Sequence, residues 1–196
     1  MMRISAFLFS TVFLLSCRPE TYVPKPRGYY LVDFPEHAYR PFDAPGFPYR
    51  FQYPTYGNVI KDTSFFGEKP DNPYWMNIDF TSLGGIVYMT YKEITPSQPL
   101  IKLIGDAYEM TQFHTKKADY IAPFKIERHD ARVYGELYNV TGNAASAYQF
   151  YVTDSAKHFI HGSLYFDVMP NADSLKPVNE FLRKDMEQML QTLEWK

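Results

Sequence analysis

The sequence predicts an α+β domain in which an antiparallel sheet of about six strands packs against two main helices. Apolar and polar side chains alternate in residues 75–80, as in a half-buried strand. Apolar side chains recur at helical spacing in residues 97–117 and again near the end of the chain. Between these two stretches, residues 124–168 contain four strand-like segments joined by short turns. Helices that each offer one apolar face, together with such a sheet, form a layered domain.

The chain begins with the features of a lipoprotein signal peptide over residues 1–16. Arg3 supplies a positive charge, and residues 4–15 are almost entirely apolar. As a helix this stretch would span about 18 Å, against about 30 Å of bilayer hydrocarbon, so it is too short to cross a membrane. The run Leu14-Leu15-Ser16-Cys17 resembles the lipobox of bacterial lipoproteins, in which the cysteine thiol takes diacylglycerol and becomes the mature N-terminus.

Cys17 is the only cysteine in the chain, and we predict that it carries lipid. The alternative is an ordinary secretory signal followed by a buried cysteine, which would leave an unexplained free thiol in an exported protein. A cysteine that carries lipid cannot act as a nucleophile or a metal ligand. Since several acyl chains anchor a protein stably, we expect the mature protein to sit on a membrane.

Residues 17–27 are predicted to form a tether, and residues 28–196 a single domain. Three prolines in residues 18–27 and the lack of apolar periodicity there indicate a stiff polyproline II segment of about 30 Å. Removal of residues 1–16 leaves 180 residues, the size of one domain. The net charge of −2 does not favour nucleic acid as a partner.

The first part of the domain is predicted to be extended and rich in turns, with short strands at residues 28–32 and 49–53. Ten of the fifteen prolines lie between Pro19 and Pro73, where they limit regular structure. Tyrosine and phenylalanine are abundant in the chain, and such rings suit both partner surfaces and half-buried sheets. The partner-surface candidates are Tyr29, Tyr30, Phe34, Tyr39, Phe42, Phe47 and Tyr49. The alternative is that these rings pack onto the sheet and close its edge.

A hairpin and a long helix are predicted next. Residues 75–80 and 85–92 form the two strands of the hairpin, because a glycine pair separates them. Residues 97–117 form the helix, which Ser97 can cap and in whose first turn a proline is tolerated. The apolar stripe of this helix consists of Leu100, Leu103, Ile104, Ala107 and Tyr108.

Four strands and a closing helix complete the predicted domain. The strands cover residues 124–128, 132–140, 145–153 and 159–168. Their short connections carry turn residues and favour an antiparallel meander. The helix starts near residues 173–174 and runs to about residue 194. Its core stripe consists of Leu175, Val178, Phe181, Leu182, Met186, Met189, Leu190 and Leu193. The residues predicted to face water are Lys184, Asp185, Glu187 and Gln188.

This order of elements resembles the fold of the PsbP and Mog1 proteins, an antiparallel sheet sandwiched by helices. The resemblance implies an α/β/α sandwich, and it implies no function.

No motif indicates catalysis or metal binding. His158 and His161 lie three residues apart near the start of a predicted strand, where they would point to opposite faces. The sequence holds no phosphate loop, dinucleotide fingerprint or serine-hydrolase elbow. We therefore predict a protein that is not an enzyme, with no metal, no cofactor and no small-molecule substrate. Residues 142–146 (GNAAS) form either a small-residue patch that a partner approaches or a hairpin turn whose following strand packs under a helix, and the second interpretation is favoured.

Two short segments resemble the Asp-Ser/Thr-aliphatic acceptor for O-glycosylation in Bacteroidetes, with Ser155 and Ser174 as the candidate residues. The alternatives are structural, since Asp154-Ser155 also suits a turn and Asp173-Ser174 a helix N-cap.

Seven segments together resemble the gliding motility lipoprotein GldD family of Bacteroidetes. They are residues 24–29 (PKPRGY), 75–80 (WMNIDF), 142–146 (GNAAS), 152–155 (VTDS), 158–159 (HF), 162–166 (GSLYF) and 192–196 (TLEWK). The resemblance implies a non-catalytic component required for gliding motility, linked to type IX secretion, whose partners are other gliding and secretion proteins. It carries over no site residue except the lipid-bearing Cys17.

The family resemblance also bears on orientation. Surface-exposed lipoproteins of this phylum usually carry an acidic cluster after the cysteine, whereas this chain has Arg18-Pro19-Glu20. We therefore predict a membrane-anchored protein that faces the periplasm, on either the inner or the outer membrane. The leading function is an assembly or scaffold lipoprotein, and the alternative is a lipoprotein that binds a glycan or a peptide on an aromatic platform.

Overall fold

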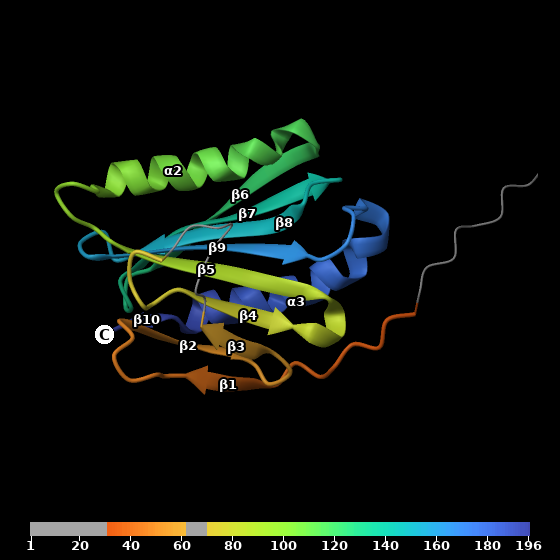
Figure 1. Ribbon diagram of the computed structural model, residues 1–196, viewed down its shortest axis with the longest axis horizontal. Helices are drawn as coiled ribbons and strands as arrows, with labels where there is room; N and C mark the ends of the chain where they lie inside the picture. The colour runs from red at the N-terminus through yellow and green to blue at the C-terminus, as the bar shows by residue number, and fades with distance from the viewer. Residues whose placement is uncertain (1–30, 62–69) are drawn as a thin grey trace, which may run out of the picture. The chain divides into compact units, whose positions relative to one another are not determined.

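Seven antiparallel strands form the main sheet in the computed structural model, which describes residues 31–61 and 70–196 (Figure 1). In spatial order the strands are β3 (Asn58–Lys61), β4 (Met76–Phe80), β5 (Gly85–Glu93), β9 (His158–Phe166), β8 (Ser146–Thr153), β7 (Val133–Gly142) and β6 (Ala118–Arg128). The hairpin β4–β5 and the meander β6–β7–β8–β9 confirm the predicted connections. The expected count of about six strands was one too low, because β3 is short and mostly exposed, and so shows no clear alternation.

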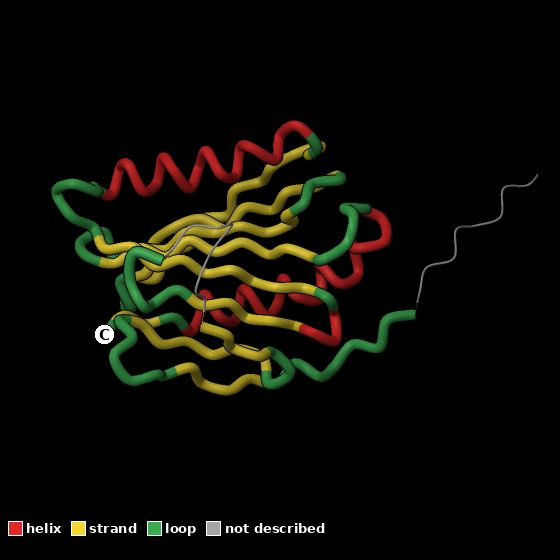
Figure 2. The backbone as a smooth tube through the Cα atoms, in the orientation of Figure 1, coloured by secondary structure: helices red, strands yellow, loops and turns green. Residues whose placement is uncertain are grey.

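Helices α2 (Leu100–Gln112) and α3 (Ala172–Thr192) cover opposite faces of this sheet (Figures 1 and 2). On β8, Tyr151 packs in a small cluster with Leu103 of α2. Its neighbour Phe150 belongs instead to the large core that contains Leu182 of α3. Since successive strand residues point to opposite faces, the sheet lies between the two helices. The predicted α+β sandwich is therefore confirmed.

A second, three-stranded sheet is built from β1 (Tyr39–Phe42), β2 (Tyr49–Pro54) and β10 (Glu194–Trp195), with β2 in the middle. Strand β2 confirms the strand predicted at residues 49–53, and it places Trp195 opposite Tyr49. Of the strand predicted at residues 28–32, the first three residues lie outside the described residues. The other two, Leu31 and Val32, are not in a strand.

Both helices start and end differently from the sequence prediction. Ser97 does not cap α2; Pro99 is the N-cap residue, while Ser97 Oγ lies 3.0 Å from Thr95 Oγ1 in the preceding turn. After Gln112 the chain tightens into a 3₁₀ turn, η3 (Phe113–Lys116). Helix α3 is capped by Asn171, whose side chain accepts a hydrogen bond from the backbone N–H of Ser174 at 3.1 Å. This helix ends at Thr192 because the next residues form β10.

None of the described helices combines the length and the apolar character that crossing a bilayer requires.

The layer under α2 contains a buried histidine, His161 on β9. Its Nε2 atom has no hydrogen-bond partner among the described residues, and burial lowers the pKa of His161 to about 4 from an ordinary value of 6.5. The imidazole is therefore neutral in the folded protein at physiological pH.

We expect His161 to make the domain sensitive to acid. Between pH 6.5 and about pH 4, the unfolded chain binds a proton at His161 that the folded chain does not, so stability falls as the pH drops, by about 3 kcal/mol in total. Urea unfolding of His161→Gln across this range should show a flatter pH profile than the wild type. His129→Gln, at an exposed position, is the control and should keep the wild-type slope. An unchanged slope in His161→Gln would contradict the assignment.

Candidate functional site

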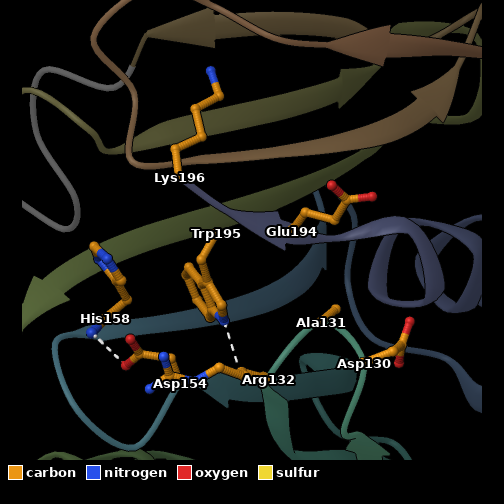
Figure 3. A pocket seen from close by; sticks show the side chains of 8 residues that line it. All are labelled: Asp130, Ala131, Arg132, Asp154, His158, Glu194, Trp195 and Lys196. Atoms are coloured by element: carbon orange, nitrogen blue, oxygen red, sulfur yellow. Dashed lines mark hydrogen bonds between the residues drawn. The ribbon is translucent and has the colours of Figure 1, made fainter.

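A polar pocket of about 550 Å³ lies where β10 meets two turns of the main sheet (Figure 3). Its lining comes from residues 130–132 between β6 and β7, from Asp154 and His158 around the β8–β9 turn, and from residues 194–196. The volume is in the range of small-molecule sites, about 300–1,000 Å³. Figure 3 shows Trp195 near the centre of this group, with the other side chains around it.

Trp195 is held in place on two sides. Its indole Nε1–H donates a hydrogen bond to the backbone carbonyl of Arg132 at 3.0 Å. Its ring stacks on His158, with 5.2 Å between the ring centroids and an interplanar angle of 10°. In Figure 3 His158 lies on one side of the indole, while Ala131 and Glu194 lie on the other. The ring is half-buried, so part of it faces the pocket.

Asp154 organises the β8–β9 turn. Its Oδ1 accepts hydrogen bonds from the backbone N–H groups of Ala156, Lys157 and His158 at 2.8–2.9 Å. Burial alone would raise the pKa of Asp154, but these three hydrogen bonds hold it below its ordinary value. Asp154 is therefore a carboxylate at neutral pH, and its second oxygen, Oδ2, takes no part in these bonds.

His158 connects the pocket to the core. Its Nδ1 lies 2.6 Å from the hydroxyl of Tyr91, and both side chains are buried. Burial lowers the pKa of His158 and raises the pKa of Tyr91. The neutral imidazole of His158 therefore stacks on one face of the Trp195 indole and helps to fix its position.

Both turns at the pocket carry backbone strain. Arg132 has φ 53° and Ser155 has φ 65°, and no other non-glycine residue of the described chain has a positive φ. Such conformations cost free energy and gather at sites where the surrounding structure holds them. The guanidinium of Arg132 is exposed and has no ionic or hydrogen-bond partner among the described residues.

The lining of this pocket combines charged and aromatic side chains and contains no serine, threonine or cysteine. Within residues 31–61 and 70–196, no three histidine, cysteine or acidic side chains lie close enough together to hold a metal ion. The charged and aromatic groups around the pocket can orient a polar molecule.

A second feature is the buried carboxylate of Asp185, a residue that was predicted to face water. Asp185 on α3 is 1% exposed. Its Oδ1 lies 2.7 Å from Nδ1 of His37 and accepts a hydrogen bond from the hydroxyl of Tyr39 at 3.0 Å. Its Oδ2 accepts a hydrogen bond from the hydroxyl of Tyr56. Burial, together with this carboxylate, raises the pKa of Tyr39 to about 12.

The Asp185 cluster fastens the start of the domain to α3. Phe181 of α3 stacks with Phe34, at 4.5 Å between ring centroids, and with His37, at 4.2 Å. The spacing offers a signal for the buried carboxylate, because residue 185 lies three and four positions from Leu182 and Met189, on the apolar face of α3.

The partner-surface candidates lie mostly against the core. Cys17, Tyr29 and Tyr30 are outside the described residues. Phe42 and Phe47 are half-buried and meet edge to face at 5.1 Å. Tyr49 is 1% exposed, so it cannot form a partner surface. Its ring packs in the core, in agreement with the alternative that these rings pack onto the sheet. Phe34 is 38% exposed and Tyr39 is half-buried, so these two remain accessible in part.

The other predicted site residues lie at the surface. Ser155 and Ser174 are both exposed, and their glycosylation stays a prediction. The turn at residues 142–146 is joined to α3, since Asn143 Oδ1 accepts a hydrogen bond from the backbone N–H of Ala172 at 2.9 Å. Gly142 and Ala144 also line a cavity of about 290 Å³ beside the start of α3. The contact with α3 supports the structural interpretation of this turn.

The pocket around Trp195 was missed because its parts are far apart in the sequence. A signal was nevertheless present, since three segments of the family resemblance supply five of its residues. These are Asp154, His158, Glu194, Trp195 and Lys196.

Comparisons with known proteins add a family and a similar structure. Residues 19–195 match the family described as gliding motility lipoprotein GldD. Among solved structures, the solution structure of cyanobacterial PsbP (CyanoP) from Synechocystis sp. PCC 6803 is similar, with 11% sequence identity and a TM-score of 0.47. That similarity covers 89% of this chain and 99% of the other. No curated protein matches the chain.

Proposed function

The chain belongs to the gliding motility lipoprotein GldD family, and from this premise we propose that it is a non-catalytic, membrane-anchored assembly component of the gliding machinery. The observation that carries the proposal is the family match over nearly the whole chain, residues 19–195. Lipid on Cys17 holds the domain at a membrane through the tether of residues 17–27. The domain works with other gliding and type IX secretion proteins on the periplasmic side.

Two features of the domain support a role in assembly. The described residues form a well-packed sandwich whose large core joins both sheets to α3. Near the first described residues, His37 and Tyr39 contact the buried Asp185 of the same helix, so this segment is held against the folded body. The partly exposed rings of Phe34 and Tyr39 lie at this junction, where a partner can reach them.

A deletion strain scored for both colony spreading and secreted proteins tests this function. We expect loss of spreading together with loss of secreted motility proteins. Loss of spreading with normal secretion would contradict the link to type IX secretion, and normal spreading would overturn the assembly role. Cross-linked complexes from wild-type cells are expected to contain other gliding or secretion proteins.

Protease treatment of intact cells tests the orientation. A protein that faces the periplasm is expected to survive, while a surface protein of known exposure is removed as the control. Loss of the protein from intact cells would contradict the periplasmic assignment.

The alternative function, a lipoprotein that binds a ligand, is favoured by one specific observation. The pocket beside Trp195 combines a half-buried aromatic ring with polar groups that converge on it.

A further inference from the structure

Three groups at the Trp195 pocket can still interact with a ligand. The guanidinium of Arg132 has no partner among the described residues, and Oδ2 of Asp154 is left over from the turn. The indole of Trp195 is half-buried and lines the pocket (Figure 3). A site that holds a cation, an acceptor oxygen and an aromatic face close together has the usual elements of small-molecule recognition.

The remaining charges of the lining are paired within the protein. Glu194 accepts a hydrogen bond from Arg50 Nε at 3.0 Å. Lys196 Nζ pairs with Asp43 and donates to the carbonyl of Ala44 at 3.2 Å. Asp130 lies 3.7 Å from Arg128. The pocket therefore carries no strong net field of one sign, and a strongly charged ligand gains little there.

Hydroxyl groups suit the two unused polar groups best. Arg132 can only donate hydrogen bonds, whereas the Asp154 carboxylate can only accept them. A hydroxyl group both donates and accepts, so neighbouring hydroxyls of one molecule satisfy both side chains without a net charge. An apolar ring face with hydroxyls at its edge would also match the indole, which offers a large apolar surface.

The site is held in shape before any ligand arrives. The stack on His158 and the hydrogen bond to the Arg132 carbonyl fix the indole. The positive φ value of Arg132 places strain in the turn that carries its guanidinium. Strain that the fold maintains next to a pocket is typical of functional sites, and a preorganised site loses less entropy on binding.

We propose that the pocket beside Trp195 binds a neutral carbohydrate. A pyranose ring lies against the exposed part of the indole, one of its hydroxyls donates to Asp154 Oδ2, and another accepts from the guanidinium of Arg132. This inference gives the alternative function a ligand class. It does not depend on the assembly role, which has its own test in the deletion strain.

Tryptophan fluorescence provides the direct test. The chain has two tryptophans, and Trp75 is buried in the core, so ligand-dependent changes report on Trp195. The full chain, extracted in a detergent without a sugar headgroup, is titrated with maltose, cellobiose and N,N′-diacetylchitobiose. We expect a saturable change in emission with at least one of these disaccharides. Saturation with none of them would overturn the proposal.

Two variants test whether binding occurs at this site. Arg132→Gly removes the guanidinium and relieves the positive φ, so we expect at least tenfold weaker sugar binding with a melting temperature no lower than that of the wild type. Asp154→Asn keeps an Oδ1 that can accept the three backbone hydrogen bonds but replaces Oδ2 with a donor. We expect this variant to stay folded and to bind at least tenfold more weakly.

Ser155→Gly is the matched control. It relieves the same kind of backbone strain one residue from Asp154, but Ser155 does not line the pocket. We expect this variant to bind the sugar as the wild type does. Sugar binding that survives both Arg132→Gly and Asp154→Asn would overturn the site, and equal weakening by Ser155→Gly would overturn the roles of the two side chains.

Discussion

Replacing Asp185 with alanine is expected to lower the free energy of unfolding by about 2–4 kcal/mol. The carboxylate is buried and has hydrogen-bond contacts with three side chains, those of His37, Tyr39 and Tyr56. Alanine leaves their polar atoms without a partner in a partly buried place, and each such group costs about 1–3 kcal/mol. Equilibrium urea denaturation of the variant measures the loss.

Lys184→Ala is the matched control for Asp185→Ala. Lys184 is the next residue on α3, and its side chain is exposed, so its replacement should change stability by no more than about 0.5 kcal/mol. Limited proteolysis should cut residues 31–38 faster in Asp185→Ala, because this segment loses its attachment to α3. An Asp185→Ala protein as stable as Lys184→Ala would show that the carboxylate does not hold the segment.

Gly135→Ala is expected to prevent folding or to destabilise the domain by more than about 4 kcal/mol, a loss that only a few mechanisms produce. A Cβ atom at Gly135 on β7 would overlap the carbonyl oxygen of Tyr151 on the neighbouring strand β8. Backbone atoms cannot move aside as a flexible side chain does, so the β7–β8 ladder must separate. The yield of folded protein and the urea midpoint measure the effect.

Gly105→Ala provides the contrast. Nothing lies within 4 Å of a Cβ atom at Gly105, which is exposed in the middle of α2. Alanine favours a helix over glycine by about 0.5–1 kcal/mol, so this variant should be slightly more stable than the wild type. Similar stability of Gly135→Ala and Gly105→Ala would contradict the close approach of β7 and β8.

Elements with strong local patterns could be predicted from the sequence. Both helices present a continuous apolar stripe, and turn residues separate the four strands of the meander, so these local signals identified them. Strands β1, β3 and β10 were missed because they have only two to four residues and depend on distant partners. The pairing of Trp195 with Tyr49, for example, joins residues from opposite ends of the domain. No local pattern contains that information.

Buried polar groups were the hardest to predict. Asp185 has a charged side chain, which is typical of the surface, but its spacing places it on the apolar face of α3. It was predicted to face water because of its charge. The deciding factor is the tertiary contact with His37, Tyr39 and Tyr56, which provides the hydrogen bonds that a buried carboxylate requires. The Trp195 pocket was also missed because it depends on tertiary contacts. Its lining comes from three segments that are far apart in the sequence, namely residues 130–132, 154–158 and 194–196.

Colony spreading of cells whose only copy carries Cys17→Ala tests the proposed mode of action most directly. The substitution removes the site of lipid attachment and leaves residues 31–196 unchanged, so the domain should fold and accumulate. We predict that the protein leaves the membrane fraction and that the cells fail to spread, at a protein level matched to the wild type by immunoblot. Normal spreading by these cells would contradict a function that depends on the lipid anchor.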